Sequence, residues 1–235
     1  EIVKIVLREM VIMEERNNFA KGKVSTHILS IAGPMIVAQL INVLYNVIDR
    51  IYIGRIPHTS TLAMGGLGIC LPIISIVIAF ANLFGMGGAP LCSIARGKGN
   101  NKEAEKIMGN AFCLLVLFGI GLMIIGFLFK EKILWLFGVS THTFKYANDY
   151  LTIYLLGTVF VLIGLGMNSF INSQGFAKIG MMTVLIGAVL NIILDPIFIF
   201  VLNMNVKGAA LATVLSQFVS ALWTIHFLRS DQTIL

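Results

Sequence analysis

Five polar side chains recur on one helical face inside an apolar stretch, where they could bind an ion, a proton or a polar ligand. They follow one another at steps of three, three, one and three residues, and they are Gln39, Asn42, Tyr45, Asn46 and Asp49. On a helix of about 3.6 residues per turn these steps keep all five on one side. Polar groups are costly in lipid, so this face is predicted to point away from lipid.

A second acidic residue lies in a later apolar stretch. Asp195 follows Asn191 by one helical turn. Pro196 comes next, and it removes a backbone donor, which leaves a carbonyl near residue 192 free for an ion, a proton carrier or water. The next stretch carries a stripe of Thr213, Gln217, Ser220 and Thr224. From their helix lengths, we expect Asp49, Asn191, Asp195 and Thr213 to meet in one polar chamber, about 7–14 Å from the same end of the bundle.

A third polar set lies between these two. Tyr150, Tyr154, Thr158 and Asn168 fall at relative positions 0, +4, +8 and +18. Eighteen residues make five full turns of a continuous helix, so Tyr150 and Asn168 are predicted to share one face.

Two interpretations of the stripes stay open. Interhelical hydrogen bonds of ~0.6 kcal/mol each would explain Gln39, Asn42, Gln217 and Ser220 as contacts that hold helices together. A carboxylate near the middle of a membrane span costs about 2.5–3.5 kcal/mol, which favours ion or proton handling for Asp49 and Asp195. Arg50 offers a rival explanation for Asp49, because the two side chains could form an ion pair.

The composition explains what surrounds these residues. Of 235 residues, 57% are hydrophobic and only 12% are charged, too few to cover the surface of a soluble domain of this size. Stretches of about 20 apolar residues span a bilayer as helices. The fold class predicted is an all-α membrane protein, a bundle of six transmembrane helices over Ile28–Ile53, Leu62–Leu91, Ile107–Phe129, Tyr150–Ile171, Ile179–Leu202 and Gly208–Phe227.

The basic residues set the orientation of this bundle. With both termini in the cytoplasm, the inner segments hold 11 Lys and Arg residues and the outer segments hold 6. The positive-inside rule therefore favours a multi-pass protein of the cell membrane with both termini inside. These residues flank apolar stretches and form no continuous basic stripe, which argues against a nucleic-acid partner. Cys70, Cys92 and Cys113 form no C-x-x-C pair, so we expect no metal or disulfide framework.

Three domain regions follow. We expect a cytoplasmic leader over residues 1–26, a six-helix transmembrane lobe over 27–228, and a cytoplasmic end over 229–235 that stops before a second lobe. The natural start could be Met13; residues 1–12 could alternatively form an interfacial amphipathic helix. The inner segment Arg96–Lys106 carries mixed charges at helical spacing, which predicts a short surface helix. Histidines at span ends, His27, His58, His142 and His226, are predicted to be interfacial.

Four segments, taken in order, resemble the N-terminal lobe of the multidrug and toxic compound extrusion (MATE) family. They are Ala32-Gly-Pro-Met35, Asn46-Val-Ile-Asp49-Arg-Ile-Tyr-Ile-Gly54-Arg, Ser93-Ile-Ala-Arg-Gly-Lys-Gly-Asn-Asn-Lys-Glu-Ala-Glu-Lys106 and Asn191-Ile-Ile-Leu-Asp195-Pro196. The pair Asn191 and Asp195 is similar to the DinF-like branch of that family. The resemblance extends from about residue 27 to 228.

The resemblance implies a transporter, not an enzyme, that exchanges organic and often cationic compounds for Na⁺ or H⁺. It implies a cation or proton site at Asp49, Asn191, Asp195 and Thr213, with no cofactor and no metal beyond Na⁺ there. Tyr150 and Asn168 match residues linked to coupling. Tyr154, Asn42, Asn46, Gln39 and Gln217 are expected in the coupling or substrate cavity. The family has two six-helix lobes, so the chain is expected to be a fragment or to pair with another copy.

Other functions have their own requirements. A lipid-linked precursor flippase would need a basic central cavity for pyrophosphate. An intramembrane aspartyl enzyme would need Asp49 and Asp195 within hydrogen-bonding distance of each other. No H-E-x-x-H or G-x-S-x-G motif is present. A structural scaffold without transport would leave the polar stripes unexplained.

Overall fold

The computed structural model describes residues 24–57, 59–230 and 233. The predicted leader, its start at Met13 and the alternative interfacial helix therefore lie almost wholly outside the described residues. Within the described part of the chain the regular structure is helical, without strands. In chain order the elements are α2 (Val24–Gly54), α3 (Ser60–Gly97), α4 (Asn101–Leu136), α5 (Phe144–Leu156), α6 (Thr158–Ser173), α7 (Ala177–Pro196), the π-helix η1 (Ile197–Val201) and α8 (Val206–Leu228).

Each of the six predicted spans coincides with one of these helices or with a pair of them. Five helices are long and apolar enough to cross a membrane, and α5 with α6 supplies a sixth span. The helices extend beyond the apolar stretches at both ends, because flanking polar residues can continue a helix into the interfacial region. The predicted all-α bundle is confirmed.

The fourth span is broken, which the sequence interpretation missed. At Gly157 the chain bends by 58° between α5 and α6. A side chain at this glycine would collide with the Val214 methyl groups of α8, so the bend brings the backbone close to its neighbour. Kinks of this size commonly occur at glycine. The expectation of one continuous helix with Tyr150 and Asn168 on a shared face is therefore wrong.

The predicted surface helix over Arg96–Lys106 is also wrong. Arg96 belongs to the last turn of α3, and the charged residues from position 102 onward belong to the first turns of α4. Between the two helices Gly99 adopts a positive φ of 75°, which a glycine accepts without strain. Asn100 then caps α4: its side-chain oxygen accepts a hydrogen bond from the Glu103 backbone N–H at 3.2 Å.

This cap gives a first prediction. Replacing Asn100 with Ala removes the acceptor and leaves a backbone donor of α4 without its partner, which should cost about 1 kcal/mol. We expect a small decrease in thermal stability of the detergent-purified protein. Asn100→Ser, which keeps a side-chain acceptor and adds no carboxylate beside Glu103, serves as the control and should melt nearer to the wild type. Equal melting temperatures for all three proteins would show that this cap contributes nothing measurable.

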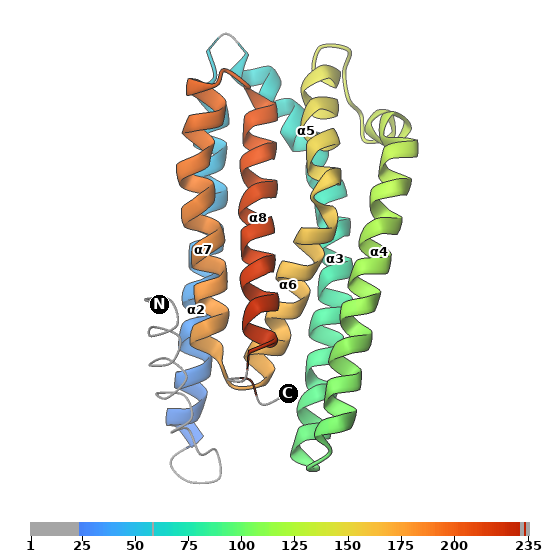
Figure 1. The fold of residues 1–235 in the computed structure, drawn as a ribbon. Coiled ribbons are helices and arrows are strands. Elements are labelled where there is room, and N and C mark those ends of the chain that lie inside the picture. Colours follow the sequence, from blue (N-terminus) through green and yellow to red (C-terminus); the bar gives the residue numbers. More distant parts are fainter. Residues whose placement is uncertain (1–23, 58, 231–232, 234–235) are drawn as a thin grey trace.

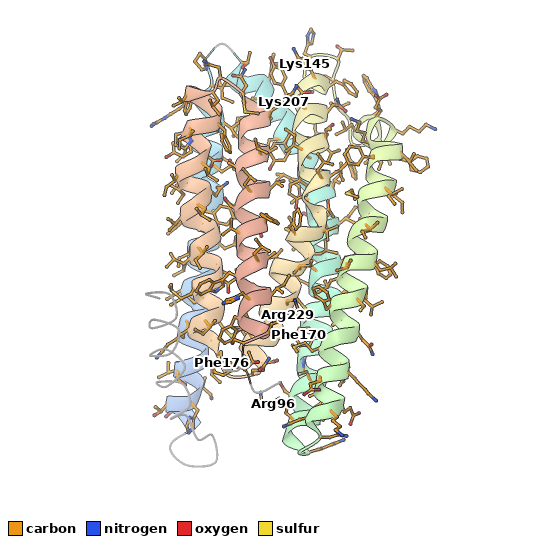
Figure 2. The ribbon with its side chains drawn as sticks, in the orientation of Figure 1. Arg96, Lys145, Phe170, Phe176, Lys207 and Arg229 are labelled. Atoms are coloured by element: carbon orange, nitrogen blue, oxygen red, sulfur yellow. The ribbon has the colours of Figure 1, made fainter. Side chains whose placement is uncertain are left out.

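The helices alternate in direction, so their connections gather at two ends (Figure 1). One end holds the α2–α3, α4–α5 and η1–α8 connections, and the other holds the α3–α4 and α6–α7 connections. We call these the outer and inner ends, after the orientation predicted from the charges. Figure 2 shows Lys145 and Lys207 at the outer end, and Arg96 and Arg229 at the inner end. The alternating helix directions therefore place these four basic residues at opposite ends in the pairs that the sequence predicted.

Close helix contacts fix one side of the bundle. A Cβ built on Gly85 of α3 would lie 2.6 Å from the backbone oxygen of Gly166 in α6. Helices approach this closely only where side chains are absent. By contrast, α2 packs mainly against α7 and has little contact with α8. Large apolar side chains such as Leu29, Leu117 and Leu128 are exposed on the outside, as expected for a surface solvated by lipid.

Candidate functional site

A cavity of about 390 Å³ opens between the helices. Residues of α2, α3, α5, α6, α7 and α8 line it, whereas α4 contributes none among the lining residues. The predicted cavity residues that line it are Gln39, Asn42, Asn46, Asp49, Tyr150, Tyr154, Asn168, Thr213 and Gln217. Tyr45 lines it as well. The polar face predicted on α2 therefore does face a cavity.

The structure brings the four residues of the expected chamber together at the outer part of this cavity. The Asn191 amide nitrogen donates to Asp195 Oδ1 and to Thr213 Oγ1, both at 3.4 Å. The Asp49 carboxyl group lies within hydrogen-bonding range of the Asp195 carboxyl group. Asp49 and Thr213 line the cavity, whereas Asp195 and Asn191 lie behind them, with 0% and 2% of their surface exposed.

Oxygen atoms dominate this group, and several have no partner. Asp49 Oδ1, Asp195 Oδ2 and Asn191 Oδ1 are buried without a hydrogen-bond donor. Thr213 Oγ1 donates its proton to the Ala209 carbonyl at 3.0 Å and accepts from Asn191, so one of its two lone pairs remains available. Buried oxygens without donors are costly unless a positive charge compensates them. Such a donor set fits either Na⁺, a cation that takes oxygen ligands, or a proton shared between the two carboxyl groups.

The ion pair offered as a rival explanation for Asp49 is not formed in this structure. Arg50 lines the same cavity but forms no ion pair with Asp49. The ion pair seen in the described part of the chain joins Lys207 and Asp149, at 3.5 Å, near the outer ends of α8 and α5. Arg50 is exposed, so solvent screens part of its charge.

Two tyrosines form the wall beside the acidic pair. The rings of Tyr150 and Tyr154 stack with centroids 6.2 Å apart and planes inclined by 14°. Both side chains are buried and line the cavity. Asn168 lies beyond the bend at Gly157, on α6, and still lines the cavity. Tyr150 and Asn168 therefore reach the same cavity from two helices joined at a bend, and not from one continuous helix.

The amides of α2 form a ladder along the cavity. The Asn46 amide nitrogen donates to the backbone oxygen of Asn42 at 2.6 Å, and the Asn42 amide nitrogen donates to Gln39 Oε1 at 3.5 Å. These bonds lie within one helix, so they do not join helices. The interhelical interpretation of Gln39 and Asn42 is therefore not what the structure shows.

The stripe on α8 divides into two parts. Thr213, Gln217 and Ser220 line the cavity. Ser220 also donates to the backbone oxygen of Thr183 in α7 at 3.2 Å, so it does join two helices. Thr224 is buried and donates to the Ser220 backbone oxygen at 3.0 Å within α8, and it does not line the cavity.

Sequence reasoning missed four polar residues that line the cavity. They are Asn82 of α3, Ser169 and Asn172 of α6, and Thr183 of α7. Asn82 lies alone in a long apolar span, and that isolation was the available signal. Asn172 follows Asn168 by one turn, a spacing that could have extended the stripe on that span.

The fold and the site define a class: a polytopic helical membrane protein with a polar cavity between its helices and buried acidic residues at one end of that cavity. Comparison with family models then places the chain more narrowly. Residues 34–197 match the MatE family model, and the chain belongs to that family. The resemblance to this family that four segments of the sequence suggested is confirmed.

Relatives and solved structures agree with this assignment. The chain is 29% identical over 217 residues to a multidrug export protein MepA of Staphylococcus haemolyticus, covering 92% of this chain and 48% of the relative. A solved outward-facing structure of a multidrug resistance MATE family transporter superposes with a TM-score of 0.83 at 25% identity, over 89% of this chain and 46% of that one. A MOP superfamily transporter from Pyrococcus furiosus, described as having a binding pocket of reverse polarity, gives a TM-score of 0.79 at 26% identity, covering 90% and 46%. The chain spans about half the length of the relatives that it matches.

Proposed function

We propose that this chain forms a cation-coupled lobe of an efflux transporter that exports amphipathic organic cations in exchange for Na⁺ or H⁺. The observation that carries the proposal is the acidic pair. Two carboxyl groups at hydrogen-bonding range cannot both remain charged without a compensating positive charge. A proton or Na⁺ supplies that charge, and Asn191 and Thr213 add neutral oxygens to the site.

Competition between the organic cation and the coupling ion for the same carboxyl groups would couple their transport. An organic cation in the cavity adjoins Asp49, which lines the cavity, while the coupling ion is held by Asp195 and Asn191 behind it. Each positive charge weakens the binding of the other, because both compensate the same carboxyl groups. This reciprocal effect of each cation on the binding affinity of the other is the thermodynamic coupling that antiport requires.

Alternating access requires a second body against which this bundle moves. We propose that a second six-helix lobe faces the cavity, either in the same polypeptide or in another copy. We further propose that the N-terminal end of α2 and the C-terminal end of α8 lie on the cytoplasmic side of the cell membrane.

The test uses the intact transporter in liposomes loaded with ethidium as the organic cation. We expect an inward gradient of Na⁺ or of H⁺ to drive ethidium out, and the effective ion identifies the coupling. Removing both gradients while the membrane potential is clamped should stop net export. Export that continues unchanged without either gradient would contradict the proposal.

The geometry argues against the two alternatives. A pyrophosphate flippase needs a basic cavity, but Arg50 is the one basic residue among those that line this cavity. An aspartyl enzyme needs both carboxyl groups in contact with the substrate. Asp49 and Asp195 do meet the distance requirement, yet Asp195 is fully buried behind Asp49 and does not line the cavity. A bond to be cleaved could not reach both carboxyl groups.

A further inference from the structure

One side of α4 is exposed along its whole length in the described structure. α4 packs against α3, α5 and α6, and no residue of α4 is among those that line the cavity. On the side that these contacts leave open, exposed residues recur at steps of three or four, which keeps them on one helical face. We call this face the α4 stripe; its residues are Lys102, Lys106, Gly109, Cys113, Leu117, Ile120, Ile124, Leu128, Glu131 and Trp135. Because the proposed second lobe faces the cavity, the α4 stripe faces lipid.

The α4 stripe changes character from one end to the other. Lys102 and Lys106, which we call the inner lysines, occupy its inner end, whereas Glu131 and Trp135 occupy its outer end. The residues between them are apolar or small. α4 has 36 residues, about 54 Å at 1.5 Å per residue, which exceeds the ~30 Å hydrocarbon core of a bilayer. Both ends of the stripe therefore reach the lipid headgroups.

Protein groups do not neutralise the inner lysines. Neither lysine forms an ion pair within the described part of the chain. The Glu103 carboxylate accepts a hydrogen bond from the Asn100 side chain at 2.8 Å, which places it at the cap of α4. Glu105 is exposed and lies about 60° around the helix from the first of the inner lysines. Residues 96–106 hold four basic and two acidic side chains, so a net positive charge of two remains there.

The basic residues at the outer end of α4 lie off the stripe. Lys130 turns toward the bundle, where its Nζ atom donates to Thr152 Oγ1 of α5 at 2.8 Å. Lys132 lies about 100° around the helix from Glu131, and its Nζ atom is 5.9 Å from the centroid of the Phe129 ring. The charge that the α4 stripe presents to lipid is therefore positive at the inner end and negative at the outer end.

From this distribution we propose that the inner half of the α4 stripe binds an anionic phospholipid. The inner lysines bind its phosphate group, and its acyl chains lie along Gly109, Cys113 and Leu117. A Cβ on Gly109 has no atom within 4 Å, so no described residue covers this position. Charge complementarity identifies the lipid as anionic, because each lysine near an anionic headgroup contributes roughly fivefold in affinity.

Cys113 allows a direct measurement, because it lies on the stripe seven residues from Lys106, whereas Cys70 and Cys92 are fully buried. The intact transporter, with Cys113 as its single cysteine, is labelled with bimane and reconstituted into phosphatidylcholine liposomes. A small fraction of the lipid carries a nitroxide quencher on one acyl chain, attached either to phosphatidylglycerol or to phosphatidylcholine. We expect phosphatidylglycerol to be enriched roughly five- to tenfold over phosphatidylcholine at Cys113.

A second label position controls for the depth of the probe. Ile124→Cys, combined with Cys113→Ser, lies on the same stripe and seven residues inward from Glu131. Bimane at this position should be quenched equally by the two lipids, within about twofold, because no basic residue belongs to that end of the stripe. An enrichment at position 124 as large as that at position 113 would contradict a site at the inner lysines.

Charge variants assign the enrichment to the inner lysines. Lys102→Gln with Lys106→Gln should reduce it to about one, whereas Lys102→Arg with Lys106→Arg should keep it, because the positive charges remain. Lys132→Gln is the matched control, since Lys132 is an exposed lysine of the same helix that lies off the stripe. It should leave the enrichment unchanged. Raising the salt concentration should lower the enrichment in the wild type.

The outcomes separate lipid binding from other partners and from the proposed export. Equal quenching by the two lipids in the wild type, or an enrichment that persists without the inner lysines, would overturn the proposal. Bimane at Cys113 that neither lipid quenches would show that protein covers the stripe, and this result would overturn it as well. Because α4 does not line the cavity, an enrichment that depends on the inner lysines supports the lipid site whether or not ethidium is exported.

Discussion

Replacing Asp195 with Asn is expected to lower export of organic cations by between about 5- and 150-fold, the range of typical coupling free energies between two sites. The amide keeps the size of the side chain and its hydrogen bond with Asn191, but it removes the negative charge that a proton or Na⁺ must compensate. Stability should not fall, because a buried neutral amide is easier to accommodate than a buried carboxylate. Ethidium efflux from cells and thermal melting of the purified protein measure the two effects.

A matched substitution on the same bundle controls this experiment. Asp149 lies at the outer end of α5, pairs with Lys207 and does not line the cavity. Asp149→Asn should change export by less than about twofold, because half-exposed ion pairs contribute little. Asp49→Asn should behave like Asp195→Asn. If both cavity variants export ethidium as well as the wild type does, the acidic pair is not the coupling site.

Replacing Gly85 with Leu is expected to prevent the bundle from folding. The nearest atoms to a Cβ at this position are the backbone oxygen and Cα of Gly166, at 2.6 and 2.7 Å. Backbone atoms cannot move aside as a flexible side chain can, so α3 and α6 would have to separate. The cost should exceed the about 1–3 kcal/mol typical of overpacking in a core. Size-exclusion chromatography of detergent extracts should show little monodisperse protein.

Gly87 provides the control, because it lies two residues away on the same helix. A Cβ on Gly87 has no atom within 4 Å, and the residue is exposed and is not among those that line the cavity. Gly87→Leu should therefore yield folded protein in amounts close to the wild type. Similar yields from the two leucine variants would show that α3 and α6 are not in the close contact described above.

The sequence predicted well those features that depend on local pattern. The long apolar stretches predicted all six spans, because the bilayer requires a length that few soluble helices reach. The spacing of polar residues predicted the cavity face of α2, since a single helix without a break keeps its period. The order of the spans predicted which connections share an end of the bundle, because successive spans run in opposite directions.

Features that depend on the packing of distant residues were not predictable in the same way. The bend at Gly157 places the backbone against Val214, which is 57 positions further along the chain. The charged segment after Arg96 suggested its own helix, but Gly99 and the Asn100 cap instead start a longer one. Asn82 could be assigned to the cavity only once several helices were brought together, because no periodic polar pattern includes it.

The burial of Asp195 and Asn191 behind Asp49 has a kinetic consequence. An ion bound there has no direct path to the cavity, so its departure must wait until the Asp49 side chain rotates away or α2 separates from α7. The lifetime of the bound ion is then governed by the mobility of α2 as much as by the strength of its ligands. Substitutions at the α2–α7 contact should therefore alter how long the ion stays without altering which ion is chosen.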